Sequence, residues 1–386
     1  MSINPAYLIR KAIIDSNLNV RGYFLSFGEG GGQLTKLCSL FPSEEAWPFR
    51  HLIFLLNTSE LDGPVTCKVP PETCAIVLNC GENQTIGNLD LYREQGFEIA
   101  MAGASVQDFD SAVMLPVDCF LINIDEHSAD ELKQIGKECA RSNRELYASG
   151  ICSREQFSFA RHAGFSRFVS SHFLEPVYQP NKPLTTAHAQ VIELLDLLRK
   201  DADDFALEEI FKRDVALSFK ILRYINSAGF GLMCEIESIR HAIQVLGRKP
   251  LYRWLILLLA TAGSTSCPAL MKTAVIRGRF VELLGAHLLD KRELDTLFIA
   301  GVFSLLDVIL ERPMEEALDC LLLPESINEA LLNQAGVFTP FIELAIACER
   351  TDPAYIHHNA LLLGLSDEII NHAHIQALAW VEELDI

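Results

Sequence analysis

The stretch CFLINIDEHSADELKQIGKECARSNRELYASG, residues 119–150, contains two short apolar runs separated by a polar, amphipathic segment. The two runs, CFLINI and ELYASG, have the length of β-strands, and the segment between them is long enough for a helix and its loops. A strand, a helix and a second strand in this order form a unit with parallel strands. Residues 119–150 therefore predict an α/β fold.

The same pattern extends along the first half of the chain. Apolar runs occur at Leu52–Asn57, Cys74–Asn79, Glu98–Gly103, Cys119–Ile124, Glu145–Gly150 and Arg167–Ser171. After the second run they are about 22 residues apart, which suits one strand, one helix and their loops. Their apolar residues are continuous rather than alternating, as is typical of strands covered on both faces. The first half is thus predicted to be an α/β domain with a mainly parallel sheet.

The sequence changes character after residue 177. Residues 178–188 (YQPNKPLTTAH) contain two prolines and no apolar periodicity, which indicates a linker. Beyond them apolar residues follow helical spacing, and no strand-like alternation occurs up to the last residue. We therefore predict a first domain at 1–177, a linker at 178–188 and an all-α helical bundle at 189–386.

The composition argues against several classes of function. The 386 residues include 51 acidic and 32 basic side chains, and the net charge of −19 repels the phosphates of nucleic acids. The 11 cysteines are scattered singly, as in proteins of a reducing cytoplasm. The first residues lack a secretory signal, and the longest apolar run, Trp254–Gly263, is too short to span a bilayer. We expect a soluble cytoplasmic protein that binds neither nucleic acid nor membranes.

The ends of the predicted strands, where α/β domains carry out their chemistry, hold few charged residues. They carry Asn57, Asn79, Ala102 with Gly103, Asn123 or Asp125, and Ser149. A site for divalent cations needs several converging carboxylates, and Asp125 alone does not supply them. The glycine run at 28–32 lacks the spacing of a phosphate-binding loop.

The histidine pairs His357–His358 and His372–His374 have no neighbouring residues at the spacing of metal ligands, so we expect exposed histidines there. No metal site and no cofactor is predicted anywhere in the chain.

Four stretches of the first half are similar to one known family. They are YLIRKAIIDSNLNVRGYFLSF (7–27), HLIFLLNTSEL (51–61), GFEIAMAGASVQDFDSAVMLPVDCFLINID (96–125) and LYASGICSREQFSFARHAGFSRFVSSHFLEPV (146–177). They resemble EAL-type cyclic-di-GMP phosphodiesterase domains in the shortened, divergent form that is fused to an HDOD domain. The resemblance implies an incomplete or divergent TIM-barrel-like fold for residues 1–177.

Active members of that family carry, at their strand ends, a Glu, an Asn, a second Glu, an Asp–Asp pair, a Lys with a following Asp, and a late Glu and Gln. The resemblance retains the Asn as Asn57, while the first Glu becomes Phe24 and the second falls among Val77–Asn79. The Asp pair becomes Ala102 and Gly103, the Lys becomes Leu121 or Asn123, and the Asp after it becomes Asn123 or remains as Asp125. The late Glu becomes Ser149 and the Gln becomes Val169. The resemblance thus implies that nearly all metal ligands are lost, and phosphodiesterase activity with them.

Residues 210–260, IFKRDVALSFKILRYINSAGFGLMCEIESIRHAIQVLGRKPLYRWLILLLA, are similar to HDOD domains, which are relatives of the HD-type metal phosphohydrolases. An HD enzyme needs an adjacent His–Asp pair, and no His in this sequence is followed by Asp. At the expected position, after LFIAGVF, the chain has Ser304 and Leu305. The resemblance therefore implies a helical domain without a metal site. Polar residues around its best-matching segment, namely Arg213, Lys220, Asn226 and Ser227, are candidates for a recognition surface.

Together these features predict a catalytically inactive bacterial signal-transduction protein that acts through protein–protein interaction. The expected partners are signalling proteins, such as a kinase, a response regulator or a cyclic-di-GMP enzyme, and the oligomeric state is left open. Two alternatives remain. One is a sensor that binds cyclic-di-GMP or another nucleotide without cleaving it. The other is a residual metal-dependent phosphodiesterase that uses replacement carboxylates such as Asp108, Asp110 or Asp125.

Overall fold

The computed structural model describes most of the two halves of the chain. The described residues are 6–27, 36–37, 39–41, 47, 49, 53–57, 70–79, 92–103, 117–179, 183–214, 217–218, 220–222, 236, 238–262, 267–321, 323–350 and 352–384, with the backbone alone for 53–57 and 261–262.

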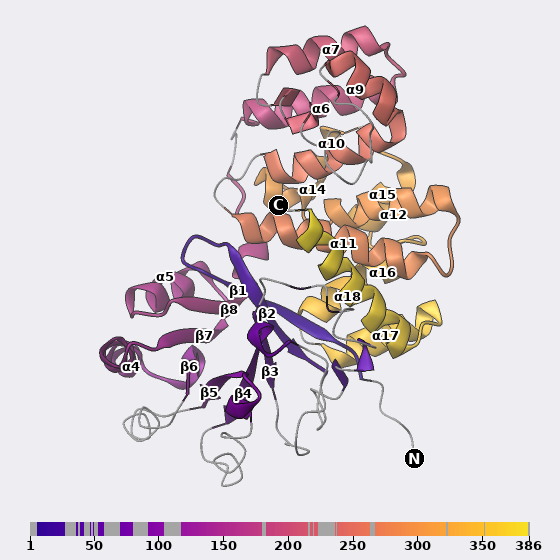
Figure 1. Cartoon of the computed structure of the whole chain (residues 1–386). Coiled ribbons are helices and arrows are strands. Elements are labelled where there is room, and N and C mark those ends of the chain that lie inside the picture. The colour runs from indigo at the N-terminus through magenta and orange to yellow at the C-terminus, as the bar shows by residue number, and fades with distance from the viewer. Residues whose placement is uncertain are drawn as a thin grey trace. The chain divides into compact units, whose positions relative to one another are not determined.

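Eight strands form a closed barrel in chain order (Figure 1). They are β1 (Ile9–Ile14), β2 (Val20–Ser26), β3 (Ile53–Asn57), β4 (Cys74–Asn79), β5 (Glu98–Ala102), β6 (Cys119–Asn123), β7 (Glu145–Ile151) and β8 (Arg167–Ser170). Neighbouring strands from β2 to β8 are parallel, whereas β1 is antiparallel to both β2 and β8. The predicted TIM-barrel-like fold is confirmed, and its divergence lies in the reversed first strand.

Two described helices of the barrel domain begin at capping boxes. Helix α4 (Ala129–Ser142) begins after Ser128, whose hydroxyl accepts from the Glu131 amide while the Glu131 carboxylate accepts from the Ser128 amide. Helix α5 (Arg154–His162) begins in the same way after Ser153, with Gln156 as the reciprocal partner. Short 3-10 turns lie at η2 (Pro71–Thr73), η3 (Ile124–Glu126) and η4 (His172–Leu174). These caps fix where the chain leaves β6 and β7.

The chain forms two compact units that interleave along the sequence. Unit 1 contains residues 1–175, 266–288 and 340–386, and unit 2 contains residues 176–265 and 289–339. The predicted linker at 178–188 was placed where the residue composition changes, whereas these two units are defined by which segments contact one another in space. Segments from the second half therefore belong to the barrel unit.

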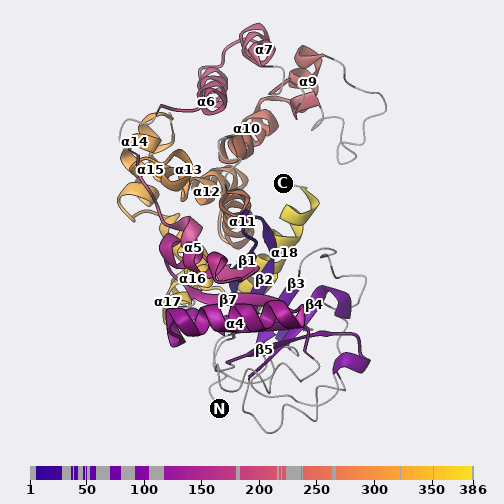
Figure 2. The same ribbon diagram turned by 90° about the vertical axis from the view of Figure 1, so that its left-hand side faces the viewer.

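Four helices of the second half join unit 1, namely α11 (Pro268–Gly285), α16 (Thr339–Arg350), α17 (Pro353–Leu363) and α18 (Asp367–Glu383). Helix α11 packs along α18 and also contacts β2 and η4 (Figure 2). Buried residues occur on all sides of α11, from Ala269 to Gly285, which explains why it needs partners on more than one face.

Unit 2 consists of helices in its described part. They are α6 (Thr186–Arg199), α7 (Asp204–Arg213), α9 (Ile239–Leu246), α10 (Arg248–Ala262), α12 (Lys291–Phe303), α13 (Leu306–Leu310), α14 (Met314–Asp319) and α15 (Glu325–Leu332). Helix α10 packs against α6, α9 and α12. The predicted helical second half is confirmed for the described residues. Within these residues, no helix combines the length and apolarity needed to cross a membrane.

Candidate functional site

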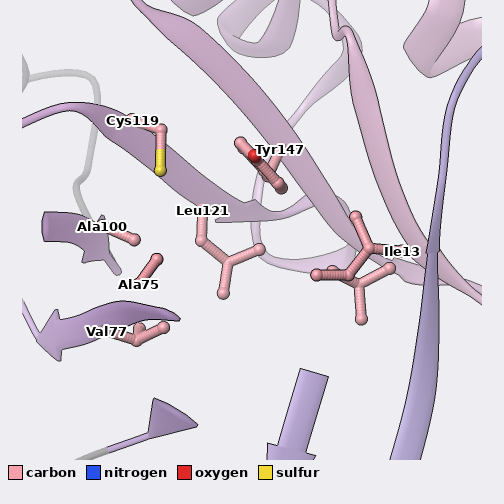
Figure 3. Close-up of a cluster of buried hydrophobic side chains, with 8 residues drawn as sticks. Ile13, Ala75, Val77, Ala100, Cys119, Leu121 and Tyr147 are labelled. Carbon is pink, nitrogen blue, oxygen red and sulfur yellow. The ribbon is translucent and has the colours of Figure 1, made fainter. Parts of the chain in front are cut away.

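Apolar side chains fill the interior of the barrel (Figure 3). The buried cluster consists of Ile13, Ala75, Val77, Ala100, Cys119, Leu121, Tyr147 and Val169, with Phe24 and Ala102 partly buried against it. Burial raises the pKa of the Cys119 thiol and of the Tyr147 hydroxyl, so both stay protonated near neutral pH. This interior thus offers neither a thiolate nor a phenolate.

Several positions that the family resemblance aligns with metal ligands lie in this cluster. Phe24, Ala102 and Leu121 come from β2, β5 and β6 and are in contact with the same group of apolar side chains. Ala102 is paired in register with Leu121 on the neighbouring strand. The structure therefore brings these three predicted site residues together, as parts of a hydrophobic core.

A second group of predicted site residues lies at the ends of β6 and β7. Asn123 and Ser149 are register partners on the two strands. The Asn123 amide donates to Glu126 Oε1 at 2.7 Å, and the Ser149 hydroxyl is 3.4 Å from the carbonyl oxygen of Ile122. Asp125 Oδ1 accepts from Gln156 Nε2 at 3.0 Å. Asn123 and Asp125 are thus bonded to the side chains of Glu126 and Gln156, and the Ser149 hydroxyl faces a carbonyl of β6.

Two residues of this second group were missed from the sequence. Gly150 has a φ of +76°, and a Cβ there would lie 2.1 Å from Asn123 Oδ1. Gln156 connects the α5 cap to Asp125, because its carbonyl oxygen also accepts from the Cys152 and Ser153 amides. The capping-box spacing of Ser153 and Gln156 could have pointed to this residue.

The donor set does not fit the two-metal centre that the phosphodiesterase family implies. Within the described residues there is no group of three or more His, Cys, Asp or Glu side chains that could hold a metal ion. Asp125 is bonded to the side-chain amide of Gln156, and this pair lacks the further carboxylates that offset the charge of divalent cations. Asn57 ends β3, but its side chain lies outside the described part of the chain, as do Asp108, Asp110 and the glycine run at 28–32.

The degenerate HD position lies between α12 and α13. The Ser304 hydroxyl donates to the Gly301 carbonyl at 2.7 Å, which helps to end α12, and Leu305 is buried. Asp307, two residues later, accepts a hydrogen bond from the Tyr178 hydroxyl at 3.2 Å. The segment that would carry an HD pair therefore helps to hold the first residues of the predicted linker.

Only part of the predicted recognition surface is described. Arg213 is exposed and lies 3.6 Å from Glu193, and Lys220 is exposed. Asn226 and Ser227 lie outside the described residues.

The expectation for the histidine pairs was wrong at one position. His357 and His358 are exposed, but His374 is fully buried and stacks on Phe280 with ring centroids 4.5 Å apart. The reason is that α18 packs along α11, which carries Phe280.

Comparison with known proteins places the second half of the chain. Residues 184–321 match the HDOD domain family. The chain contains an HDOD domain. The chain is 26% identical over 252 residues to the cyclic di-GMP phosphodiesterase CdgJ of Vibrio cholerae, and the match covers 65% of this chain and 58% of that protein. It is 29% identical over 242 residues to the uncharacterized protein YuxH of Bacillus subtilis, covering 61% of this chain and 58% of that one.

The HDOD match and these relatives confirm the resemblance to an EAL–HDOD fusion. The matches span 58% of the length of both curated relatives.

Solved structures that match part of the chain include a phosphodiesterase and a protein with an EAL domain. The PaMucR phosphodiesterase in complex with c-di-GMP has a TM-score of 0.32 and 14% identity, and covers 42% of this chain and 87% of that chain. The Bacillus subtilis YkuI protein, with an EAL domain in complex with c-di-GMP and calcium, has a TM-score of 0.34 and 16% identity, covering 59% and 66%.

Proposed function

We propose that this chain is a cytoplasmic signal-transduction protein of cyclic-di-GMP pathways that does not hydrolyse the dinucleotide and acts by binding other signalling proteins. The observation that carries the proposal is the apolar interior of the barrel. Phe24, Ala102 and Leu121 belong to one hydrophobic cluster, and the family resemblance aligns Phe24, Ala102 and one of Leu121 or Asn123 with ligands of active members.

Hydrolysis by two metal ions requires carboxylates that hold the cations and a bound water that they activate. A divalent cation transferred into an apolar interior loses its hydration without gaining ligands, which costs far more than the domain's stability. The bulky Phe24 and Leu121 side chains also occupy space inside the barrel that metal ions and their ligands would need. This interior therefore favours a barrel that does not hydrolyse cyclic-di-GMP.

Partner binding is a use for two enzyme-derived folds that does not require a metal site. We infer that a kinase, a response regulator or a cyclic-di-GMP enzyme is the partner, and that the exposed side chains of Arg213 and Lys220 are part of the contact surface. Reversing the charge of these two residues should weaken capture of the partner from a native bacterial lysate. Lys137→Glu, an exposed substitution on α4, is the matched control. Equal capture of the partner by the charge-reversed variant and the control would show that Arg213 and Lys220 are not part of the contact surface.

The named activity of CdgJ supports a second candidate, a residual metal-dependent phosphodiesterase. The two are separated by titrating the purified protein with cyclic-di-GMP in Mg²⁺ or Mn²⁺, with calorimetry and product analysis on the same samples. We expect no product. Product that disappears with a chelator would establish the phosphodiesterase, and heat without product would establish a sensor.

A further inference from the structure

A cavity of about 260 Å³ lies within unit 2, between α6, α10 and the residues that follow α14. Its apolar lining includes Ile192, Leu195, Leu321 and Leu323, and its polar lining includes Arg199 and Tyr252. Arg199 is the last residue of α6, and Tyr252 lies on α10. The cavity thus has an apolar wall and two polar groups from different helices.

The side chains of Arg199 and Tyr252 make no hydrogen bond or ion pair with any residue that the structure describes. They are close enough to interact electrostatically, because burial raises the pKa of the Tyr252 hydroxyl while Arg199, the smaller effect, lowers it. The hydroxyl therefore stays protonated and can donate a hydrogen bond. A guanidinium and a hydroxyl donor converge on the same space without an acceptor among the described residues.

Two carboxylates also line the cavity, and each has a cation of its own. Asp196 accepts from Lys200 Nζ at 2.6 Å, and Glu193 lies 3.6 Å from Arg213 Nη1. Neither Lys200 nor Arg213 lines the cavity. Each carboxylate thus has a cation outside the cavity, and the Arg199 guanidinium is the positive charge in the lining.

We propose that this cavity binds a small organic monoanion, with its apolar body against Ile192, Leu195 and Leu323 and its carboxylate on Arg199 and Tyr252. Guanidinium groups bind carboxylates through charge-assisted hydrogen bonds, and ligand sites combine apolar walls with a few placed polar groups. The volume is at the small end of ligand pockets, so the ligand has about the size of one substituted ring. This site gives the HDOD domain a small-molecule input that the proposed partner binding does not require.

Benzoate is a suitable probe, with benzyl alcohol and benzylamine as neutral and cationic analogues of the same size. Binding to the full chain is measured by saturation-transfer NMR and calorimetry. We expect benzoate to bind, benzyl alcohol to bind about 10-fold more weakly and benzylamine to bind least, because one charge-assisted hydrogen bond accounts for about a factor of ten or more. Equal binding of benzylamine and benzoate, or no benzoate binding at millimolar concentration, would overturn the proposal.

Variants test the site itself. Arg199→Gln should weaken benzoate about 10-fold or more, whereas Arg292→Gln, the same change at an exposed position on α12, should leave it unchanged. Asp196→Asn should strengthen binding, because it removes a negative charge from the lining and frees Lys200. A gain in affinity cannot result from misfolding, so this variant decides the question even if Arg199→Gln is unstable. Loss of affinity in Asp196→Asn, or equal effects of the two arginine variants, would refute the assignment.

Discussion

Arg10 of β1 donates a hydrogen bond from Nη2 to Oε1 of Glu349 in α16 at 3.0 Å. Arg277 of α11 donates to the same carboxylate, with 2.6 Å between its Nη2 and Glu349 Oε2. All three side chains are at least 93% buried. One carboxylate thus compensates two buried guanidinium groups, and the three side chains come from distant segments of the chain.

Glu349→Gln should strongly destabilise unit 1, because it keeps the shape of the side chain but removes the negative charge that two buried guanidinium groups contact. Removing one partner of a buried ion pair typically costs about 3–5 kcal/mol. The free energy of unfolding, followed by urea titration, measures this loss. Glu138→Gln breaks an exposed ion pair with Arg141 and should cost less than about 1 kcal/mol. Equal losses in the two variants would contradict the role of Glu349.

The start of β1 is also bonded to α18. The Leu8 amide donates to Asn371 Oδ1 at 2.7 Å, and the Asn371 side-chain amide donates to the Ala6 carbonyl at 2.8 Å. The Ala6 amide donates to Asp367 at 3.0 Å. Residues near the two ends of the chain therefore share a hydrogen-bond network, and β1 depends on helices that follow the HDOD match.

A fragment of residues 1–177 should not fold into a stable barrel, because it lacks α11, α16 and α18 and leaves Arg10 without Glu349. We expect it to show no cooperative thermal transition by circular dichroism, in contrast to the full chain. Linking residues 266–288 and 340–386 to this fragment in one polypeptide, with 178–265 and 289–339 removed, should restore a transition. A cooperative transition in 1–177 alone would show that the C-terminal helices are dispensable.

The sequence predicts the parallel strands well for a physical reason. The strands from β4 to β8 are largely apolar, because most of their residues are buried. β1 has the sequence IRKAII and contains a buried Arg10, whose partner Glu349 is far along the chain. No local pattern could have predicted that pair. For the same reason, the composition boundary at 178–188 could not reveal that α11 and α16 to α18 join the barrel unit.

The sequence predicted which residue types occur at the candidate site better than it predicted how they contact one another. The resemblance aligned Phe24, Ala102 and either Leu121 or Asn123 with ligand positions, and the apolar nature of Phe24, Ala102 and Leu121 was evident from the sequence. What could not be predicted is that Asp125 is bonded to Gln156 and that Asn123 approaches Gly150, since these contacts depend on how β6, β7 and α5 meet.

Gly150→Ala should destabilise the barrel more than Gly103→Ala does. Both glycines have positive φ, +76° and +71°, so each substitution carries the backbone strain of about 1–2 kcal/mol. At Gly103 a Cβ meets nothing within 4 Å, whereas at Gly150 it lies 2.1 Å from Asn123 Oδ1. The difference between the two unfolding free energies measures the overlap with Asn123. Equal values would mean that the Asn123 side chain moves away without cost.

His172, just after β8, should make the stability of unit 1 fall under mildly acidic conditions. Its Nδ1 is 2.9 Å from the Ser170 hydroxyl, and its ring stacks on Phe157 with centroids 4.5 Å apart. Burial, with a smaller contribution from Arg154, lowers the pKa of His172 to about 4. In the unfolded chain the pKa is about 6.5, so between pH about 6.5 and 4 the unfolded state binds a proton that the folded state does not.

Stability therefore decreases as the pH falls through this window, and His172→Asn should flatten the decrease, because asparagine does not titrate. The measurement is the urea midpoint of each protein at several pH values between 7 and about 4. His374, whose pKa is also lowered by burial, keeps part of the dependence in the variant. An unchanged decrease in His172→Asn would show that His172 takes up its proton in the folded state as readily as in the unfolded chain, and a steeper decrease would show that the folded state binds this proton more readily; either result would contradict the lowered pKa.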